Sequence, residues 1–216
     1  MTKPNLTHIV VVLDRSGSMA LLRQETIGGF NYFIAEQKKV EGQCTLTLTQ
    51  FDNQFQVDYS NKPIQEVPDL TTETYMPRGY TKLLDAIGKT INEVGEELKG
   101  IQEELRPSKV IVCIITDGQE NSSQEFNWGQ VKALMDTQRS KYSWDFLFLS
   151  SSEAAIESAV KGLGMGRDTT LSYAPSGMGT GVAMASMGQT VSSARRTGRT
   201  ASFSAKQQEE AEKTKS

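Results

Sequence analysis

The sequence lacks the long hydrophobic runs that a membrane segment requires. Its longest apolar runs have the length of a strand, and no basic segment with a long apolar stretch precedes Asp14. We therefore expect neither a signal peptide nor a transmembrane helix. An excess of positive charge is also absent, because 23 Lys and Arg residues stand against 26 Asp and Glu residues, for a net charge of -3. This balance argues against general nucleic-acid binding.

Histidine is nearly absent as well, since His8 is the only one. It stands at the entrance of an expected strand, away from the polar residues described next, so we expect a structural role. No Ser-His-Asp triad can then form near those polar residues. The remaining composition is ordinary, with 37% hydrophobic and 23% charged residues. A chain of 216 residues is long enough for one α/β domain with a buried core and a tail.

An apolar run that ends in a carboxylate stands near the start of the chain. Residues 8–13 read His-Ile-Val-Val-Val-Leu, which predicts a strand buried on both faces in a parallel sheet, and Asp14 ends it. Ligands of α/β sheets bind at the carboxyl ends of such strands. Ser16 and Ser18 follow, and Gly17 lets the backbone curl so that both hydroxyls face one point. These oxygens suit Mg²⁺, Mn²⁺ or Ca²⁺. The alternative is that a serine caps the helix that follows.

Two distant segments favour the metal site. Thr81 precedes a strongly helical stretch, and residues 111–116 form a second buried strand that ends in Asp117. The three segments together resemble the metal-ion-dependent adhesion site of a von Willebrand factor A domain, over about the first 175 to 195 residues. The resemblance implies that five residues form the metal site: Asp14, Ser16, Ser18, Thr81 and Asp117. Because a proline-containing connector delivers Thr81, we expect Thr81 to approach or leave the ion while the first turn stays fixed.

The same resemblance implies a doubly wound, Rossmann-like sheet of six strands in the order 3-2-1-4-5-6. Asp52 and Asn53 form a two-residue turn between strands 2 and 3, which predicts that strand 3 is the antiparallel edge of an otherwise parallel sheet. In this order Cys44 and Cys113 lie on strands to either side of strand 1, about 9.6 Å apart, beyond the roughly 7 Å limit for a disulfide. We expect free, buried thiols and a cytoplasmic location.

The periodicity of the rest of the chain predicts the other elements. Further strands are expected at residues 45–51, 54–59, 144–149 and 169–173, and helices at 19–39, 83–105, 126–139, 153–163 and 177–195. Gly28 and Gly29 fall inside the first helix, where close packing against the sheet or a kink would explain them. We expect a domain at residues 1–196. Residues 197–216 are expected to be a disordered tail, because Phe203 is their only apolar residue beyond alanine.

Three functions compete. The first is a metal-dependent protein-binding module without enzymatic activity, in which an aspartate or glutamate of a partner protein completes the coordination of the ion. The overall sequence pattern, including residues 25–31 and 77–81, is similar to that of stand-alone A domains of bacteria and phages. Some bacterial relatives act with AAA+ ATPases, so the resemblance implies such an ATPase or its substrate as a partner. The second is a metal-dependent phosphoester hydrolase, although Ser16 stands where a haloacid-dehalogenase-like phosphatase carries its general acid. The third is a structural component of a phage particle.

Overall fold

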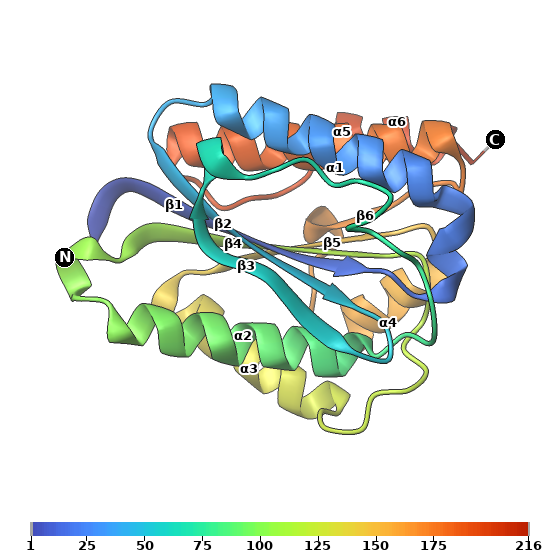
Figure 1. Cartoon of the computed structure of the whole chain (residues 1–216), viewed down its shortest axis with the longest axis horizontal. Coiled ribbons are helices and arrows are strands. Elements are labelled where there is room, and N and C mark those ends of the chain that lie inside the picture. Colours follow the sequence, from blue (N-terminus) through green and yellow to red (C-terminus); the bar gives the residue numbers. More distant parts are fainter. Residues whose placement is uncertain (1, 216) are drawn as a thin grey trace.

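The fold is built around a six-stranded sheet with helices on both faces (Figure 1). The computed structural model describes residues 2–215. The strands lie in the order β3-β2-β1-β4-β5-β6, and only the β2–β3 pair is antiparallel. Their bounds are Lys3–Asp14 (β1), Gln43–Phe51 (β2), Phe55–Pro63 (β3), Pro107–Thr116 (β4), Asp145–Ser150 (β5) and Thr170–Ser172 (β6). The predicted fold class, strand order and antiparallel edge are confirmed.

Helices form a layer on each side of the sheet. One layer holds α1 (Arg23–Lys39), α5 (Gly177–Thr197) and α6 (Ala205–Lys213). The other holds α2 (Leu83–Gly100), α3 (Trp128–Tyr142) and α4 (Glu153–Leu163). Four short 3₁₀ helices complete the secondary structure of the described residues: η1 (Gly17–Leu22), η2 (Ile64–Glu66), η3 (Glu103–Leu105) and η4 (Arg167–Thr169). None of these helices has both the length and the apolar character that a membrane span needs.

The central strand β1 contributes side chains to a hydrophobic core on each face of the sheet. Val11 and Leu13 pack with the α1 and α5 layer, whereas Val10 and Val12 pack with the α2 and α3 layer, and all four are fully buried. Each such side chain contributes about 1.5–3 kcal/mol relative to an exposed one. The continuous apolar run of β1 therefore reflects burial on both faces, and it holds Asp14 at a fixed place where the strand ends.

The glycine pair in α1 has a different partner from the one expected. A Cβ built on Gly29 would lie 2.6 Å from Met184 Cγ in α5, whereas nothing lies within 4 Å of a Cβ on Gly28. Gly29 thus allows α1 and α5 to approach each other closely, and the expected packing of both glycines against the sheet is wrong. The reason is that α1 and α5 lie side by side on the same face of the sheet.

The C-terminal segment differs from the expected disordered tail. Ala201, Phe203 and Ala211, the last within α6, are buried in the core on the face of the sheet that α1 and α5 cover. Ser204 begins α6 with a capping box that it shares with Gln207, whose amide also donates to Ser186 O at 2.9 Å. Protein interiors are closely packed, and alanine is small enough to fit between neighbouring elements. These alanines and one phenylalanine can therefore attach the segment to the domain despite its polar composition. The segment therefore packs on the domain instead of extending from it.

Arg195, near the end of α5, links α5 to α1. Its guanidinium donates to Gln37 O at 2.7 Å and to Val40 O at 3.3 Å, where α1 ends. The carbonyl groups at the end of a helix lack partners within the helix. Arg195 therefore caps α1 from α5.

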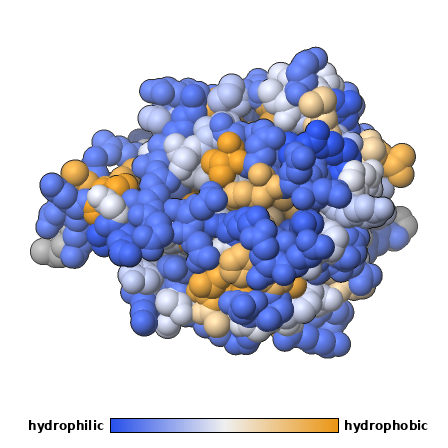
Figure 2. Space-filling view, turned by 60° about the horizontal axis from the view of Figure 1, so that its bottom comes forward, coloured by the Kyte–Doolittle hydropathy of each residue, from blue (hydrophilic) through white to orange (hydrophobic). Residues whose placement is uncertain are grey.

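The outer face around α2 and α3 is mostly hydrophilic, with separate hydrophobic areas among hydrophilic residues (Figure 2). This view brings the lower side of Figure 1 forward. The pattern is that of helices whose apolar stripe faces the sheet and whose opposite side faces water.

Candidate metal site

The site lies where β1 and β4 end at the same edge of the sheet. These strands are parallel neighbours in register, with Leu13 opposite Ile115. Asp14 and Asp117 therefore leave the sheet side by side, at the point where the order of strands reverses. The turn after β1 is tied to the segment that leads to Thr81, because Gly17 N donates to Gly79 O at 3.1 Å. Gly79 has a φ of +70°, a left-handed conformation that favours glycine.

Four of the predicted residues form one hydrogen-bonded network. Asp14 Oδ1 accepts from Ser16 N at 2.6 Å, and Asp14 Oδ2 accepts from Thr116 Oγ1 at 2.6 Å. The Ser16 and Ser18 hydroxyls lie 3.1 Å apart, and Ser18 Oγ donates to Asp117 Oδ1 at 2.6 Å. Because Ser18 uses its proton on Asp117, Ser16 must be the donor to Ser18. Every hydroxyl proton in the network therefore points along a chain that ends on a carboxylate.

Thr81 reaches the same site from the segment that precedes α2. A Cβ on Gly118 would lie 3.4 Å from Thr81 Oγ1 and 3.7 Å from Ser18 Oγ, so both hydroxyls border Gly118. The structure thus brings all five predicted residues together. Ser18 is exposed and Asp117 is half-buried, whereas Asp14, Ser16 and Thr81 are buried. The site is therefore open to solvent only at Ser18 and Asp117.

Neither serine acts as the helix cap that the alternative interpretation required. Ser16 occupies the N-cap position of η1, but its side chain makes no capping hydrogen bond. The N-cap of α1 is Leu22, which has no polar side chain to offer. The hydroxyls of Ser16 and Ser18 are instead directed into the network with Asp14 and Asp117.

The two carboxylates are held in an unfavourable environment. Burial raises the pKa of Asp14 to about 6, and the hydrogen bonds from Thr116 and Ser16 offset this only in part. Burial also raises the pKa of Asp117. Neither side chain forms an ion pair within the described part of the chain. A divalent cation placed between them would supply the missing charge.

The donor set fits a hard cation. Two carboxylates and three hydroxyls are all oxygen ligands, which suit Mg²⁺, Mn²⁺ or Ca²⁺. Residues 2–215 contain no cluster of three or more His, Cys, Asp or Glu side chains that could hold a metal. An ion at this edge of the sheet would therefore depend on the hydroxyls of Ser16, Ser18 and Thr81 as well as on the aspartates.

Sequence reasoning missed several residues that support the site. Tyr75 OH donates to Asp14 O at 2.7 Å from beneath the turn. Asp52, treated only as a turn residue, is buried and binds Arg15 Nε at 3.0 Å and Arg78 Nε at 2.8 Å. It thereby joins the turn after β1 to the segment before Thr81. An aspartate in a tight turn carries no signal in the sequence that it will also bind two arginines.

His8 and the cysteines lie away from the site. His8 Nδ1 is 2.8 Å from Thr45 Oγ1, and Nε2 is 3.2 Å from Thr47 Oγ1, so the ring is held between side chains of β2. Burial lowers the pKa of His8 to about 4. Cys44 and Cys113 are free, buried thiols, as expected.

The strand order and helix layers are those of a von Willebrand factor A domain. No family model matches the sequence, and no curated protein matches it.

Solved structures match in shape. Proximal thread matrix protein 1 from the mussel byssus aligns with a TM-score of 0.59 and 14% identity, over 87% of this chain and 46% of that one. The same mussel protein with a zinc-occupied MIDAS motif aligns with a TM-score of 0.53 and 15% identity, over 77% and 41%. Manganese-loaded TRAP protein from Plasmodium vivax aligns with a TM-score of 0.54 and 13% identity, over 79% and 69%. This chain thus spans less than half the length of the mussel protein, and identities this low show the fold alone.

Proposed function

We propose that this protein is a metal-ion-dependent protein-binding module. Asp14, Ser16, Ser18, Thr81 and Asp117 would hold a divalent cation, and an acidic side chain of a partner protein would complete its coordination. The observation that carries the proposal is the pair of desolvated carboxylates, linked by hydroxyls and without a cationic partner among the described residues. A bound cation would stabilise the charged form of both carboxylates.

The charge of the site favours an acidic partner. Hydroxyl ligands are neutral, so an ion bound mainly through Ser16, Ser18 and Thr81 keeps part of its positive charge. The chemistry that a bound ion supplies here is a positive, exchangeable position at the protein surface. A carboxylate from another protein has the charge and the hard oxygen atoms that such a position prefers.

The surroundings of the site favour a protein partner over a small molecule. Leu21 in η1 is 92% exposed, Tyr80 beside Thr81 is 66% exposed, and Met178 at the start of α5 is 74% exposed. Large apolar side chains exposed on neighbouring segments are typical of protein-binding surfaces. A partner that inserted a carboxylate would also cover these side chains.

The comparisons support the same reading. The mussel protein has a structure with zinc in its MIDAS motif, and the TRAP protein has one loaded with manganese. For this chain we propose Mg²⁺ or Mn²⁺, with Ca²⁺ as the alternative. A partner such as an AAA+ ATPase or its substrate, a cytoplasmic location and a bacterial or phage source remain predictions from the sequence.

The hydrolase alternative has less support. Activation of water by a metal usually relies on a nearby general base or acid. His8 is bound by threonines within the sheet, and Ser16 occupies the position of the expected acid. We therefore propose that the protein has no enzymatic activity. Metal-stimulated phosphatase or nuclease activity that disappeared in Asp14→Ala would contradict this.

Calorimetric titration with Mn²⁺ and Mg²⁺ tests the metal site. We expect weak uptake, which the double variant Ser16→Ala, Thr81→Ala abolishes and the exposed control Ser140→Ala leaves intact. Uptake that persisted in the double variant would place the metal elsewhere. A pull-down from the native cell with and without EDTA then tests the partner, and capture that was equal in EDTA would refute a metal-dependent interaction.

A further inference from the structure

The loop after β4 supplies the cap of α2. The N-cap residue of α2, Lys82, makes no capping hydrogen bond with its side chain. Instead Glu120 Oε2 accepts from Leu84 N at 2.9 Å, while Glu120 Oε1 accepts from Ser122 N at 2.8 Å and from Ser123 N at 2.6 Å. The first amides of a helix need such partners from outside the helix. One carboxylate thus fixes both the start of α2 and the loop.

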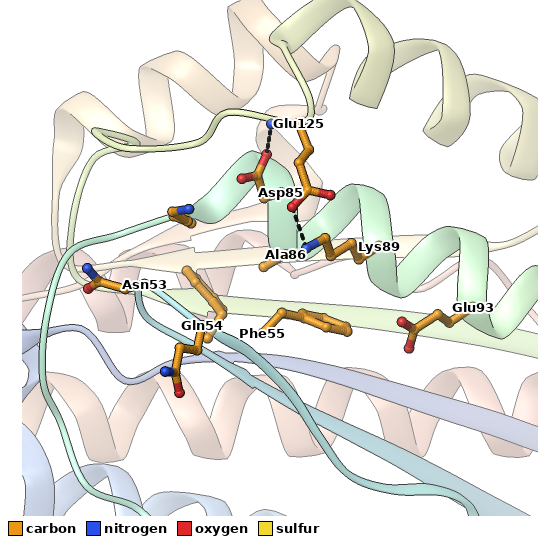
Figure 3. Close-up of a pocket in the computed structure, with 10 residues that line it drawn as sticks. Asn53, Gln54, Phe55, Asp85, Ala86, Lys89, Glu93 and Glu125 are labelled. Carbon is orange, nitrogen blue, oxygen red and sulfur yellow. Dashed lines mark hydrogen bonds and ion pairs between the residues drawn. The ribbon is translucent and has the colours of Figure 1, made fainter.

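A second carboxylate makes the attachment reciprocal. Asp85 in the first turn of α2 is buried and accepts from the backbone amides of Gln124, Glu125 and Phe126 at 2.8–3.0 Å. Burial acts to raise the pKa of Asp85, but these three amides outweigh it and hold the pKa below its usual value. Figure 3 shows Asp85 directed at Glu125 on the wall of a cavity of about 370 Å³. The Glu125 side chain pairs with Lys89 of α2 at 2.6 Å, which adds a further link.

Asn121 makes the same kind of contact with Thr81 itself. Thr81 N donates to Asn121 Oδ1 at 3.1 Å, and Asn121 N donates to Thr81 O at 3.3 Å. Both polar backbone groups of Thr81 are therefore bound by one residue of the loop that begins at Asp117. The side-chain hydroxyl of Thr81 borders Gly118, as the Ser18 hydroxyl does.

We propose that residues 117–127 and the start of α2 form one unit, in which Asn121 is the positioning residue for Thr81. This inference rests on the proposed metal site and adds its internal coupling. Thr81 does not move toward or away from the ion by itself, as the connector in the sequence suggested. The hydroxyl of Thr81 and the carboxylate of Asp117 are held in the same unit, so a displacement of one displaces the other. Metal affinity then depends on a residue that need not touch the metal.

Asn121→Ala and Asn127→Ala form a matched pair of variants. Both replace an asparagine of the same loop by alanine, but Asn127 caps α3 and has no hydrogen bond to Thr81. We expect Asn121→Ala to weaken Mn²⁺ binding at least tenfold in calorimetry, and Asn127→Ala to change it less than twofold. A wild-type affinity in Asn121→Ala, or an equal loss in Asn127→Ala, would overturn the proposal.

Hydrogen exchange of the Thr81 amide in EDTA provides a readout without metal. We expect faster exchange in Asn121→Ala than in the wild type or in Asn127→Ala. Asn121→Asp keeps the acceptor oxygen and should restore slow exchange. Unchanged exchange of Thr81 in Asn121→Ala would also refute the positioning role. If the wild type bound no Mn²⁺, the proposed function would fail, and the exchange measurements alone would decide whether Asn121 holds Thr81.

Discussion

Ser18 Oγ donates a 2.6 Å hydrogen bond to Asp117 Oδ1 across 99 residues of sequence. A serine hydroxyl has one proton and two lone pairs, so Ser18 can keep this proton on Asp117 while a lone pair binds a cation. Asp117 can then stabilise the ion without direct contact. The bond thus explains how a site with two carboxylates can leave much of the charge of the ion for a partner.

Asp14→Asn should stabilise the metal-free protein and abolish its response to metal. Burial raises the pKa of Asp14 to about 6 from a usual 3.8, so near neutral pH its charge destabilises the fold by an amount on the order of 3 kcal/mol. Asparagine keeps the acceptor for Ser16 N but loses the favourable contact with Thr116, so we expect a net gain of about 1–3 kcal/mol. Urea unfolding in EDTA and in Mn²⁺ measures both effects. The exposed Asp69→Asn is the control, and a loss of stability in EDTA would contradict the argument.

His8 should make the protein sensitive to acid. Burial lowers its pKa from 6.5 to about 4, so between these values the unfolded chain binds a proton that the folded protein does not. The contribution of neutral His8 is complete above pH 6.5 and is lost as the pH falls to about 4, for a total on the order of 3 kcal/mol. Urea unfolding across this range should show a shallower dependence on pH in His8→Gln than in the wild type.

Asp14 changes the stability of the protein in the opposite direction over an overlapping pH range. Its pKa is raised in the folded protein, so it adds stability as the pH falls from about 6 toward 3.8. The effect of His8 must therefore be taken as the difference between His8→Gln and its parent, with both proteins carrying Asp14→Asn. Parallel pH profiles in that background would refute the assignment to His8.

Phe203→Ala tests whether the C-terminal segment is part of the core. Phe203 is buried in the core on the face of the sheet that α1 and α5 cover, and replacing a buried phenylalanine by alanine costs about 3–5 kcal/mol. We expect a loss of this size in urea unfolding. The exposed Lys206→Ala should stay within about 0.5 kcal/mol of the wild type. Unchanged stability in Phe203→Ala would mean that the segment is a loose tail, as its composition suggested.

The apolar residues near the site should bind the partner without binding the metal. We expect Leu21→Ser combined with Tyr80→Ser to weaken metal-dependent capture of the partner by about tenfold or more. Mn²⁺ affinity in calorimetry should not change. The control combines Leu105→Ser with Tyr142→Ser, two exposed residues that precede β4 and β5 at the opposite edge of the sheet. Equal losses in the two double variants would refute a specific surface around the site.

Much of the fold could be predicted because its signals are local. The apolar runs that end in Asp14 and Asp117 reflect burial on both faces. The connection of residues 52–54, one residue longer than the predicted two-residue turn, is still short enough to make β3 the antiparallel edge. The candidate site could be assembled for the same reason, since its residues follow the ends of adjacent strands. Only the family resemblance, however, placed Thr81 with them.

The remaining features depend on contacts between distant segments. Gly29 is required by Met184, and Thr81 is held by Asn121. Neither pair leaves a periodic pattern in the sequence. The C-terminal helix was missed because composition averaged over residues 197–216 hides where Phe203 and Ala211 fall. Alanine adds little to such an average, yet Ala211 is fully buried.

The packing of the C-terminal segment has a consequence for synthesis of the chain. Phe203 N donates to Asp168 O at 2.7 Å, and Ala174 N donates to Thr214 Oγ1 at 3.0 Å. Residues on both sides of β6 therefore form hydrogen bonds with residues that are synthesised later. Chains emerge from the ribosome from the N-terminus onward at about 5–20 residues per second. β6 can pair with β5 earlier, but the contacts that flank β6 are complete only after residue 214 has left the exit tunnel. Until then a nascent chain exposes the apolar surface that α6 later covers, and a ribosome stalled in this region would present it to chaperones and proteases.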